Sequence, residues 1–331
     1  MEKNLHQCDV VLHWRTRWRA YCFLLSILFA FALFTGCVQT TEEASDITPL
    51  MWKVTSLEDR IMYLFGSIHA AKQDIYPLPA TIMDAFNSCD SLAVEANIYK
   101  VGSGSVATYI DEKSMYKNGG VISDEIDSDL YERARTTIKE LGVIQEETLH
   151  TLDFYRPVKW IGLLNDTAYT KAGLSTSYGL DMYFLKEATK RHMEILEIES
   201  LVDVAMIQIR FSLPLQEWLL QSALDVESAA LSVTELYNLW KAGDLQALVE
   251  LLFSAENDDM PDELNNEYND AIIIQRNLHM ADMVERYFSD RKTVFYVVGL
   301  QHYLEKDGIV ELLTQRGYTV ERIEMHPMAS F

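Results

Sequence analysis

Two segments near opposite ends of the chain share one pattern. Residues 63–69 read YLFGSIH and residues 296–302 read YVVGLQH, so each is an apolar run typical of a strand that ends in Gly-x-x-His. A glycine at the end of a strand permits a sharp turn or the close approach of another backbone. The histidine then lies just beyond the carboxyl edge of the strand, where ligands bind in open α/β sheets. If the two segments pair about a pseudo-twofold axis, His69 and His302 converge on one crevice.

The remaining patterns place strands near the two ends of the chain and helices between them. Each Gly-x-x-His segment leads through a helix into a further strand. The expected strands are 52–54, 61–65, 91–96, 193–198, 293–298 and 318–323. The expected helices are 79–88, 128–141, 148–172, 178–191, most of 201–289 and 305–316. Residues 100–126 are expected to form a surface excursion. We therefore predict an α/β fold, with a mixed sheet built from two strand–Gly-x-x-His–helix–strand halves at the termini and a large helical insert.

The charge of the chain limits its partners. It has 331 residues, of which 50 are acidic and 28 basic, for a formal net charge of −22. A surface this acidic repels phosphate backbones, so we expect no nucleic-acid partner. Its 14 glycines and 7 prolines are about half the usual share, which favours helices over a disordered or hairpin-rich chain.

The N-terminus has the pattern of a secretory signal. Arginines between residues 15 and 19 precede the apolar run 20–34, and small residues follow it. The run is shorter than the roughly 20 residues that a membrane span needs. Residues 33–37 (LFTGC) resemble a bacterial lipobox, in which Cys37 is lipidated and becomes the new N-terminus. A plain cleaved signal and an uncleaved anchor are the alternatives.

This pattern predicts three parts of the chain. Residues 1–36 are a lipoprotein signal peptide, 37–50 a polar tether and 51–331 the folded domain. Val38 after the lipidated cysteine favours the outer membrane in the lipoprotein sorting scheme, so the domain would face the periplasm or the cell exterior. After export and lipidation Cys89 is the one remaining thiol, and neither a disulfide nor a cysteine metal site is expected.

A carboxylate ends one of the expected strands. Residues 91–95 read SLAVE, and a carboxylate at the end of a buried strand is costly unless it is paired or binds a cation. Two imidazoles and one carboxylate are a common ligand set for a divalent transition metal that keeps open positions. The sequence thus indicates a metal site of His69, Glu95 and His302. The alternative is that Glu95 caps a helix or pairs with an arginine or lysine.

These motifs resemble those of the TraB/PrgY/GumN family, to which the Tiki membrane-tethered metalloproteases are related. The matching segments are 63–69 (YLFGSIH), 76–79 (YPLP), 92–95 (LAVE), 178–184 (YGLDMYF), 196–197 (LE), 276–281 (RNLHMA), 298–302 (VGLQH) and 307–318 (DGIVELLTQRGY). The segments follow the order typical of the family, and the resemblance extends over about residues 52–323. The resemblance implies an EreA/ChaN-like α/β core with a helical insert.

From the Tiki relatives, the resemblance also implies metal-dependent peptide hydrolysis. Manganese or cobalt is the expected metal, with zinc as a further candidate. By position, His69, Glu95 and His302 would be metal ligands or close catalytic partners. The substrate would be a peptide or a protein.

Four further residues are implied by position in the family motifs. Arg276 and Asn277 fall on a helical Arg-Asn motif, and Arg276 would stabilise an oxyanion or bind a substrate carboxylate. Asp181 and Glu197 would support a ligand or act as a general base, and Glu95 is a second candidate for moving the proton. A structural alternative for Arg276 is a buried ion pair with Asp181 or Glu197.

The first hypothesis for function is therefore an exported lipoprotein that hydrolyses peptides with a divalent metal. A second is a non-catalytic lipoprotein that binds a peptide or haem, for which tyrosine, methionine and histidine side chains supply ligands. A third is a scaffold linked to polysaccharide export.

Overall fold

The computed structural model describes residues 45–99, 104–253 and 260–325. The expected signal peptide and Cys37 lie outside these ranges. Among the described residues, none of the helices combines the length and the apolar character needed to cross a membrane.

Six strands form one mixed sheet, and they lie close to the expected positions. They are β1 (Met51–Thr55), β2 (Ile61–Ser67), β3 (Ser91–Val94), β4 (Glu194–Glu197), β5 (Val294–Gly299) and β6 (Thr319–Arg322). Their order is β4-β3-β5-β2-β1-β6. The first four in this order run parallel, while β1 is antiparallel to both of its neighbours. The predicted α/β class with a mixed sheet is confirmed.

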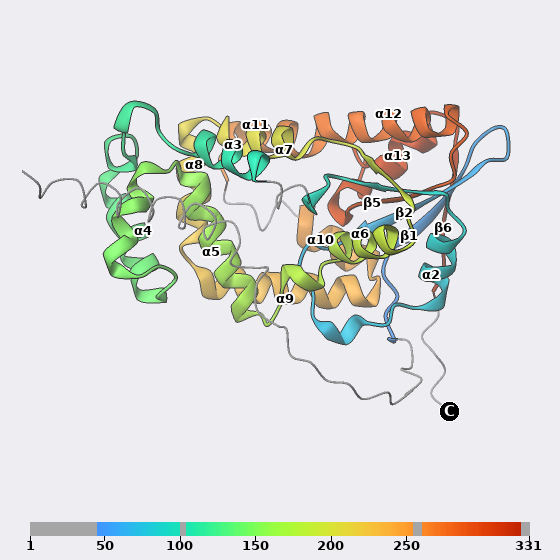
Figure 1. Ribbon diagram of the computed structural model, residues 1–331, viewed down its shortest axis with the longest axis horizontal. Coiled ribbons are helices and arrows are strands. Elements are labelled where there is room, and N and C mark those ends of the chain that lie inside the picture. Colours follow the sequence, from blue (N-terminus) through green and yellow to red (C-terminus); the bar gives the residue numbers. More distant parts are fainter. Residues whose placement is uncertain (1–44, 100–103, 254–259, 326–331) are drawn as a thin grey trace, which may run out of the picture.

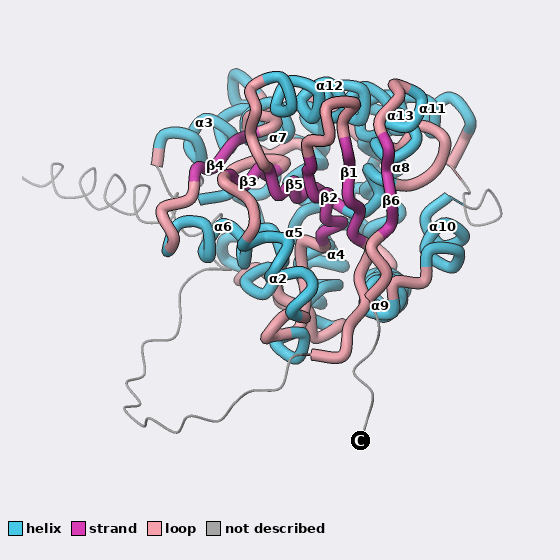
Figure 2. Tube along the Cα trace, turned by 90° about the vertical axis from the view of Figure 1, so that its right-hand side faces the viewer, coloured by secondary structure: helices cyan, strands magenta, loops and turns pink. Residues whose placement is uncertain are grey.

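Helices cover both faces of this sheet. The α-helices are α2 (Ala80–Asn87), α3 (Ser105–Ser114), α4 (Ser128–Leu141), α5 (Pro157–Lys171), α6 (Leu180–Lys190), α7 (Leu201–Ile209), α8 (Leu213–Ala223), α9 (Val226–Ala242), α10 (Leu245–Phe253), α11 (Asp262–Asn269), α12 (Gln275–Ser289) and α13 (Ile309–Gln315). Figure 2 shows α12 and α13 on one side of the strands and α2 and α6 on the other. Strands covered on both faces read as continuous apolar runs, which explains the composition of β3 and β5.

Successive residues of β5 illustrate the two layers. Phe295 lies with its ring centroid 4.9 Å from that of Phe184 on α6, and 5.8 Å from that of Phe65 on β2. Tyr296 points to the opposite face, where its hydroxyl donates to the carbonyl oxygen of Met280 on α12 at 2.9 Å. The alternation of side chains along a strand thus joins the sheet to both helical layers.

The two Gly-x-x-His strands are direct neighbours. β2 and β5 pair in parallel, with Gly66 opposite Val298 and Ser67 opposite Gly299. A Cβ atom on Gly66 would lie 2.6 Å from Cδ1 of Leu300, a residue of the second motif. A side chain at position 66 would therefore have to displace Leu300, and the glycine of the first motif lets the second motif pack against its backbone.

The sheet is less symmetric than two equal halves would be. β2 leads through α2 to β3, and β5 leads through α13 to β6, as expected from the sequence. β3 pairs directly with β5, however, whereas β1 separates β6 from β2. The arrangement of two related halves stays an interpretation.

The helical insert forms a lobe with its own core, on the left in Figure 1. Trp160 of α5 is fully buried there, and its indole N–H donates to the carbonyl oxygen of Leu152 at 3.1 Å. Apolar residues of α4, α8 and α9 surround it. The lobe lies apart from the strands in Figure 1.

Three segments differ from expectation. The predicted helix 148–172 is split, because Pro157 begins α5 and holds the preceding residue extended, after a 3-10 helix at Glu146–Phe154. The expected surface excursion 100–126 contains α3 and two 3-10 turns. Residues 45–50, expected in the tether, pack on the domain, with Ile47 and Leu50 buried.

We predict that Gly66→Ala lowers the free energy of unfolding by about 1–3 kcal/mol, because the added methyl group overpacks a buried contact with Leu300. Urea denaturation followed by circular dichroism measures the change. Gly162→Ala is the matched control: nothing lies within 4 Å of its added Cβ, and helix propensity should raise stability by up to about 1 kcal/mol. Equal stability of Gly66→Ala and wild type would contradict the packing argument.

Candidate metal and hydrolytic site

Three of the expected residues meet at the carboxyl edges of β2, β3 and β5. His69 follows β2, Glu95 directly follows β3, and His302 lies in a 3-10 helix, Leu300–Tyr303, after β5. A Cβ atom on Gly299 would lie 3.5 Å from Nε2 of His69, 3.6 Å from Oε2 of Glu95 and 3.7 Å from Cδ2 of His302. The three side chains therefore surround one point, which is open only because residue 299 is glycine.

His69 is oriented by a carboxylate from α6. Its Nδ1 lies 3.0 Å from Oδ2 of Asp181, whose Oδ1 accepts a hydrogen bond of 3.0 Å from the hydroxyl of Ser67. The backbone N–H of Leu180 donates to the carbonyl oxygen of Ile68 at 3.1 Å, which docks the first turn of α6 on the motif. Nδ1 is thus engaged and Nε2 faces the shared point.

The charge of Asp181 raises the pKa of His69 to about 9, against a smaller lowering by burial. The side chain of His69 is nevertheless 58% exposed, so solvent screens part of this interaction. The same exposure makes the imidazole accessible to a ligand or substrate from solvent.

His302 is oriented by an amide from α12. Nδ2 of Asn277 donates to the carbonyl oxygen of Asp307 at 2.8 Å, so its Oδ1 is an acceptor. That oxygen lies 2.6 Å from Nδ1 of His302, which therefore carries the proton and leaves Nε2 with a lone pair. Burial lowers the pKa of His302 to about 4, so the imidazole is neutral at pH 7.

Glu95 presents its two oxygens to different partners. Oε1 accepts a hydrogen bond from Nη2 of Arg276, and Oε2 accepts one of 3.3 Å from the backbone N–H of Gly299. Burial favours the neutral acid, but the positive charges that His69 and His302 carry at low pH, together with that of Arg276, outweigh it and hold the pKa of Glu95 at about 2. A carboxylate with so low a pKa is a weak proton acceptor at neutral pH, and it suits a cation better.

The cluster carries more negative than positive charge. Glu95, Glu199 and Asp181 supply three carboxylates, whereas Arg276 is the guanidinium that binds two of them. With neutral imidazoles this leaves an excess of two negative charges. A proton on His69 offsets one of them, and a divalent cation in its place would offset both.

The donor set fits a divalent transition metal, although no finished coordination shell is present. Both imidazoles use Nδ1 to bind an orienting acceptor, which is the usual arrangement for histidine ligands that bind metal through Nε2. Within residues 45–99, 104–253 and 260–325, no group of three or more His, Cys, Asp or Glu side chains is already arranged tightly enough to hold an ion.

The structure places the other expected residues unequally. Each of three residues contacts one central side chain: Asp181 contacts His69, Arg276 contacts Glu95 and Asn277 contacts His302. Glu197 is the last residue of β4, opposite Val94, and its role in proton transfer stays a prediction. The alternative role of Arg276, a buried ion pair, is found, but the partners are Glu95 and Glu199 and not Asp181 or Glu197.

Glu199 is the residue that the sequence interpretation missed. Like Glu95, it lies just beyond the end of a strand in the parallel part of the sheet, and this position was a signal that could have revealed it. The backbone N–H of Glu199 donates to the carbonyl oxygen of Glu95 at 2.9 Å, which extends the β3–β4 ladder by two residues beyond Glu197.

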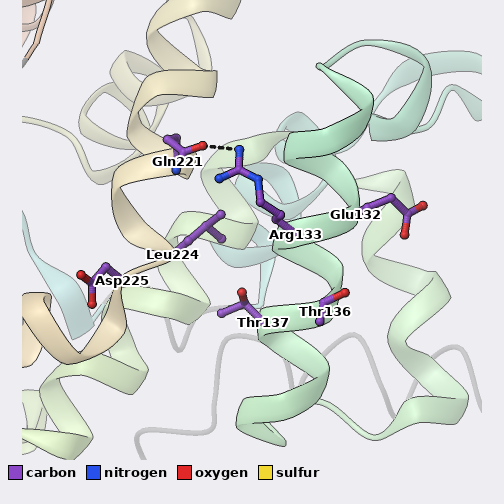
Figure 3. A pocket seen from close by; sticks show the side chains of 7 residues that line it. All are labelled: Glu132, Arg133, Thr136, Thr137, Gln221, Leu224 and Asp225. Atoms are coloured by element: carbon purple, nitrogen blue, oxygen red, sulfur yellow. Dashed lines mark hydrogen bonds between the residues drawn. The ribbon is translucent and has the colours of Figure 1, made fainter.

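A separate hollow lies in the helical lobe (Figure 3). Arg133 of α4 reaches across it to the amide oxygen of Gln221 on α8. Its lining residues are Glu132, Arg133, Thr136, Thr137, Gln221, Leu224 and Asp225. None of them belongs to the cluster of His69, Glu95 and His302, so the hollow is distinct from the candidate metal site.

Comparison with known proteins gives one family and several distant relatives. The model of the TraB/PrgY/gumN family matches residues 50–322. "Uncharacterized protein YbaP" of Escherichia coli is 24% identical over 265 residues, which cover 78% of this chain and 90% of that protein. "Metalloprotease TIKI2" of Xenopus tropicalis is 22% identical over 336 residues, covering 87% of this chain and 62% of that protein.

A second metalloprotease shows the same level of similarity. "Metalloprotease TIKI1" of Danio rerio is 20% identical over 331 residues, which cover 87% of this chain and 65% of that protein. No solved structure matches the chain.

We predict that Asn277→Ala lowers the free energy of unfolding by about 1–3 kcal/mol, because Nδ1 of His302 loses its buried hydrogen-bond partner. Urea denaturation tests this. Gln275→Ala, an exposed position on the same helix, should change stability by no more than about 0.5 kcal/mol. An equal effect of the two substitutions would mean that the Asn277–His302 hydrogen bond contributes nothing.

Proposed function

The chain belongs to the TraB/PrgY/gumN family, and from this premise we propose that it is a metal-dependent peptide hydrolase. The observation that carries the proposal is the convergence of His69, Glu95 and His302 on one open point beside Gly299. The names of the two metalloprotease relatives support peptide hydrolysis as the reaction.

Three atoms are assigned to the metal: Nε2 of His69, Oε2 of Glu95 and Nε2 of His302. Nε2 of His302 has a free lone pair because its Nδ1 donates to Asn277, and the carboxylate of Glu95 is ionised. His69, whose pKa lies at about 9, carries a proton on Nε2 at neutral pH and would have to release it to the metal. A divalent metal bound there, with manganese or cobalt preferred and zinc as the alternative, supplies Lewis acidity that polarises a carbonyl group and makes water more acidic.

The remaining residues prepare this ligand set. Asp181 and Asn277 hold the two imidazoles in one tautomer and one orientation. Arg276 binds Oε1 of Glu95, so that Oε2 alone faces the site. Glu95 and Glu197 are the two candidates for moving the proton, and the low pKa of Glu95 suits a ligand better than a base.

The cellular setting is part of the proposal. An N-terminal signal and lipidation at Cys37 would anchor the domain to the outer membrane, with the site facing the periplasm or the cell exterior. The substrate would then be a peptide or protein of that compartment. The two halves expected for an EreA/ChaN-like core would each supply one histidine.

Metal analysis tests the site. The full chain, purified in detergent, should hold about one equivalent of manganese or cobalt per chain. His69→Ala and His302→Ala should each remove most of this metal and abolish cleavage of fluorogenic peptides, because each deletes a ligand. Elemental analysis and peptide cleavage are the measurements.

His150→Ala is the control, since this exposed histidine lies in the helical lobe and should leave metal content and activity unchanged. Wild-type metal content in both His69→Ala and His302→Ala would refute the shared site. A Soret band that forms on haem addition and disappears in His69→Ala would favour the haem-binding alternative instead.

Lipidation is tested separately. Cys37→Ser removes the thiol that would carry the lipid, so the variant should lose labelling by a radioactive fatty acid. It should also either leave the membrane fraction or accumulate as the precursor with its signal peptide uncleaved. Cys89→Ser, a buried thiol of the domain, should retain both membrane attachment and label. Undiminished labelling of Cys37→Ser would exclude Cys37 as the lipidated residue.

A further inference from the structure

Glu199 is a buried carboxylate that the proposed ligand set does not use. Its backbone pairs with that of Glu95, so the two residues stand side by side at the ends of β4 and β3. Their side chains are only 10% and 12% exposed. Two ionised carboxylates that are this deeply buried side by side repel each other unless a cation lies between them.

Arg276 is that cation, and more of its N–H donors bind Glu199 than Glu95. Nε donates to both oxygens of Glu199, at 3.1 and 3.0 Å, and Nη2 donates to Oε2 of Glu199 at 2.6 Å. The same Nη2 also donates to Oε1 of Glu95. Glu199 therefore occupies the Nε–Nη2 edge of the guanidinium group and leaves Glu95 a single contact.

This division determines what Glu95 presents to the site. Its Oε2 is left to the backbone N–H of Gly299 and to the point shared with the histidines. Without Glu199, the guanidinium could bind both oxygens of Glu95 in the bidentate manner typical of arginine and carboxylate. Its positive charge would then cancel the negative charge of the proposed ligand.

Glu199 is itself held in place from both sides. Nε2 of His279 donates to the carbonyl oxygen of the preceding residue, Ile198, at 3.0 Å. The next residue, Ser200, caps α7 by accepting the backbone N–H of Asp203 at 3.0 Å. The carboxylate thus extends from a backbone that is anchored to α12 and to the start of α7.

We propose that Glu199 is a positioning residue, which binds Arg276 and cancels its charge so that Glu95 keeps one anionic oxygen for a divalent metal. The inference rests on the proposed function, because it takes Glu95 as a metal ligand.

Calorimetric titration of the metal-stripped full chain with Mn²⁺, in detergent, tests the inference. Glu199→Gln keeps the size of the side chain but removes its charge, and should weaken Mn²⁺ binding about 10- to 100-fold, as loss of a residue that supports a ligand commonly does. The double variant Glu199→Gln/Arg276→Met removes both charges together. It should recover most of the lost affinity, because no uncancelled guanidinium then competes for Glu95.

Glu194→Gln is the matched control. Glu194 is the first residue of β4, at the opposite end of this strand from Glu199, and is exposed. It forms an ion pair with Lys292 and touches none of the proposed ligands, so Mn²⁺ affinity should equal that of wild type. A purely structural role of Glu199 predicts a lower melting temperature for the single variant without any recovery of affinity in the double variant.

The outcomes separate the two proposals. A wild-type chain that binds neither Mn²⁺, Co²⁺ nor Zn²⁺ overturns the proposed function and this inference with it. Wild-type binding combined with an unaffected Glu199→Gln, or with a double variant as weak as the single one, overturns the role of Glu199 alone.

Discussion

The parallel pairing of β2 with β5 is the constraint on which the rest of the structure depends. It joins segments that are more than 200 residues apart in the sequence, and it places two histidine-bearing loops at one edge of the sheet. The pairing is tight because residue 66 has no side chain, which lets Leu300 pack on its backbone. Aromatic rings of β2, β5 and α6 fill the core beneath.

At that edge of the sheet, hydrogen bonds and ion pairs orient the side chains that the strand pairing brings together. Each imidazole has one nitrogen bound by an acceptor from a helix, Asp181 on α6 and Asn277 on α12, so the two helical layers each orient one histidine. Arg276, next to Asn277, balances the carboxylates of Glu95 and Glu199. An apolar replacement of any of these polar groups would leave a buried partner without its hydrogen bond or counter-charge, which ties the stability of the edge to its chemistry.

Much of this arrangement could be predicted from local patterns. The six strands appear as short apolar runs, and Glu95 is recognisable because a carboxylate ends such a run. Local patterns could not predict which carboxylates form ion pairs with Arg276. Glu197 and Glu199 lie on one strand end two residues apart, and only the pairing with β3 shows that Glu199 stands beside Glu95. The break before Pro157 was missed because the apolar spacing continues through it.

The amino-acid sequence by itself determined which segments become strands and helices, and which chemical groups stand at the strand ends, because these depend on the period of apolar residues and on single glycines within a few positions. Only the tertiary structure decided that β1 lies between β2 and β6, that His69 and His302 share Gly299 as a neighbour, and that Arg276 binds Glu199. The physical reason is that strand order and ion pairing are settled by contacts between distant segments, whose free energies depend on burial and mutual distance rather than on spacing along the chain.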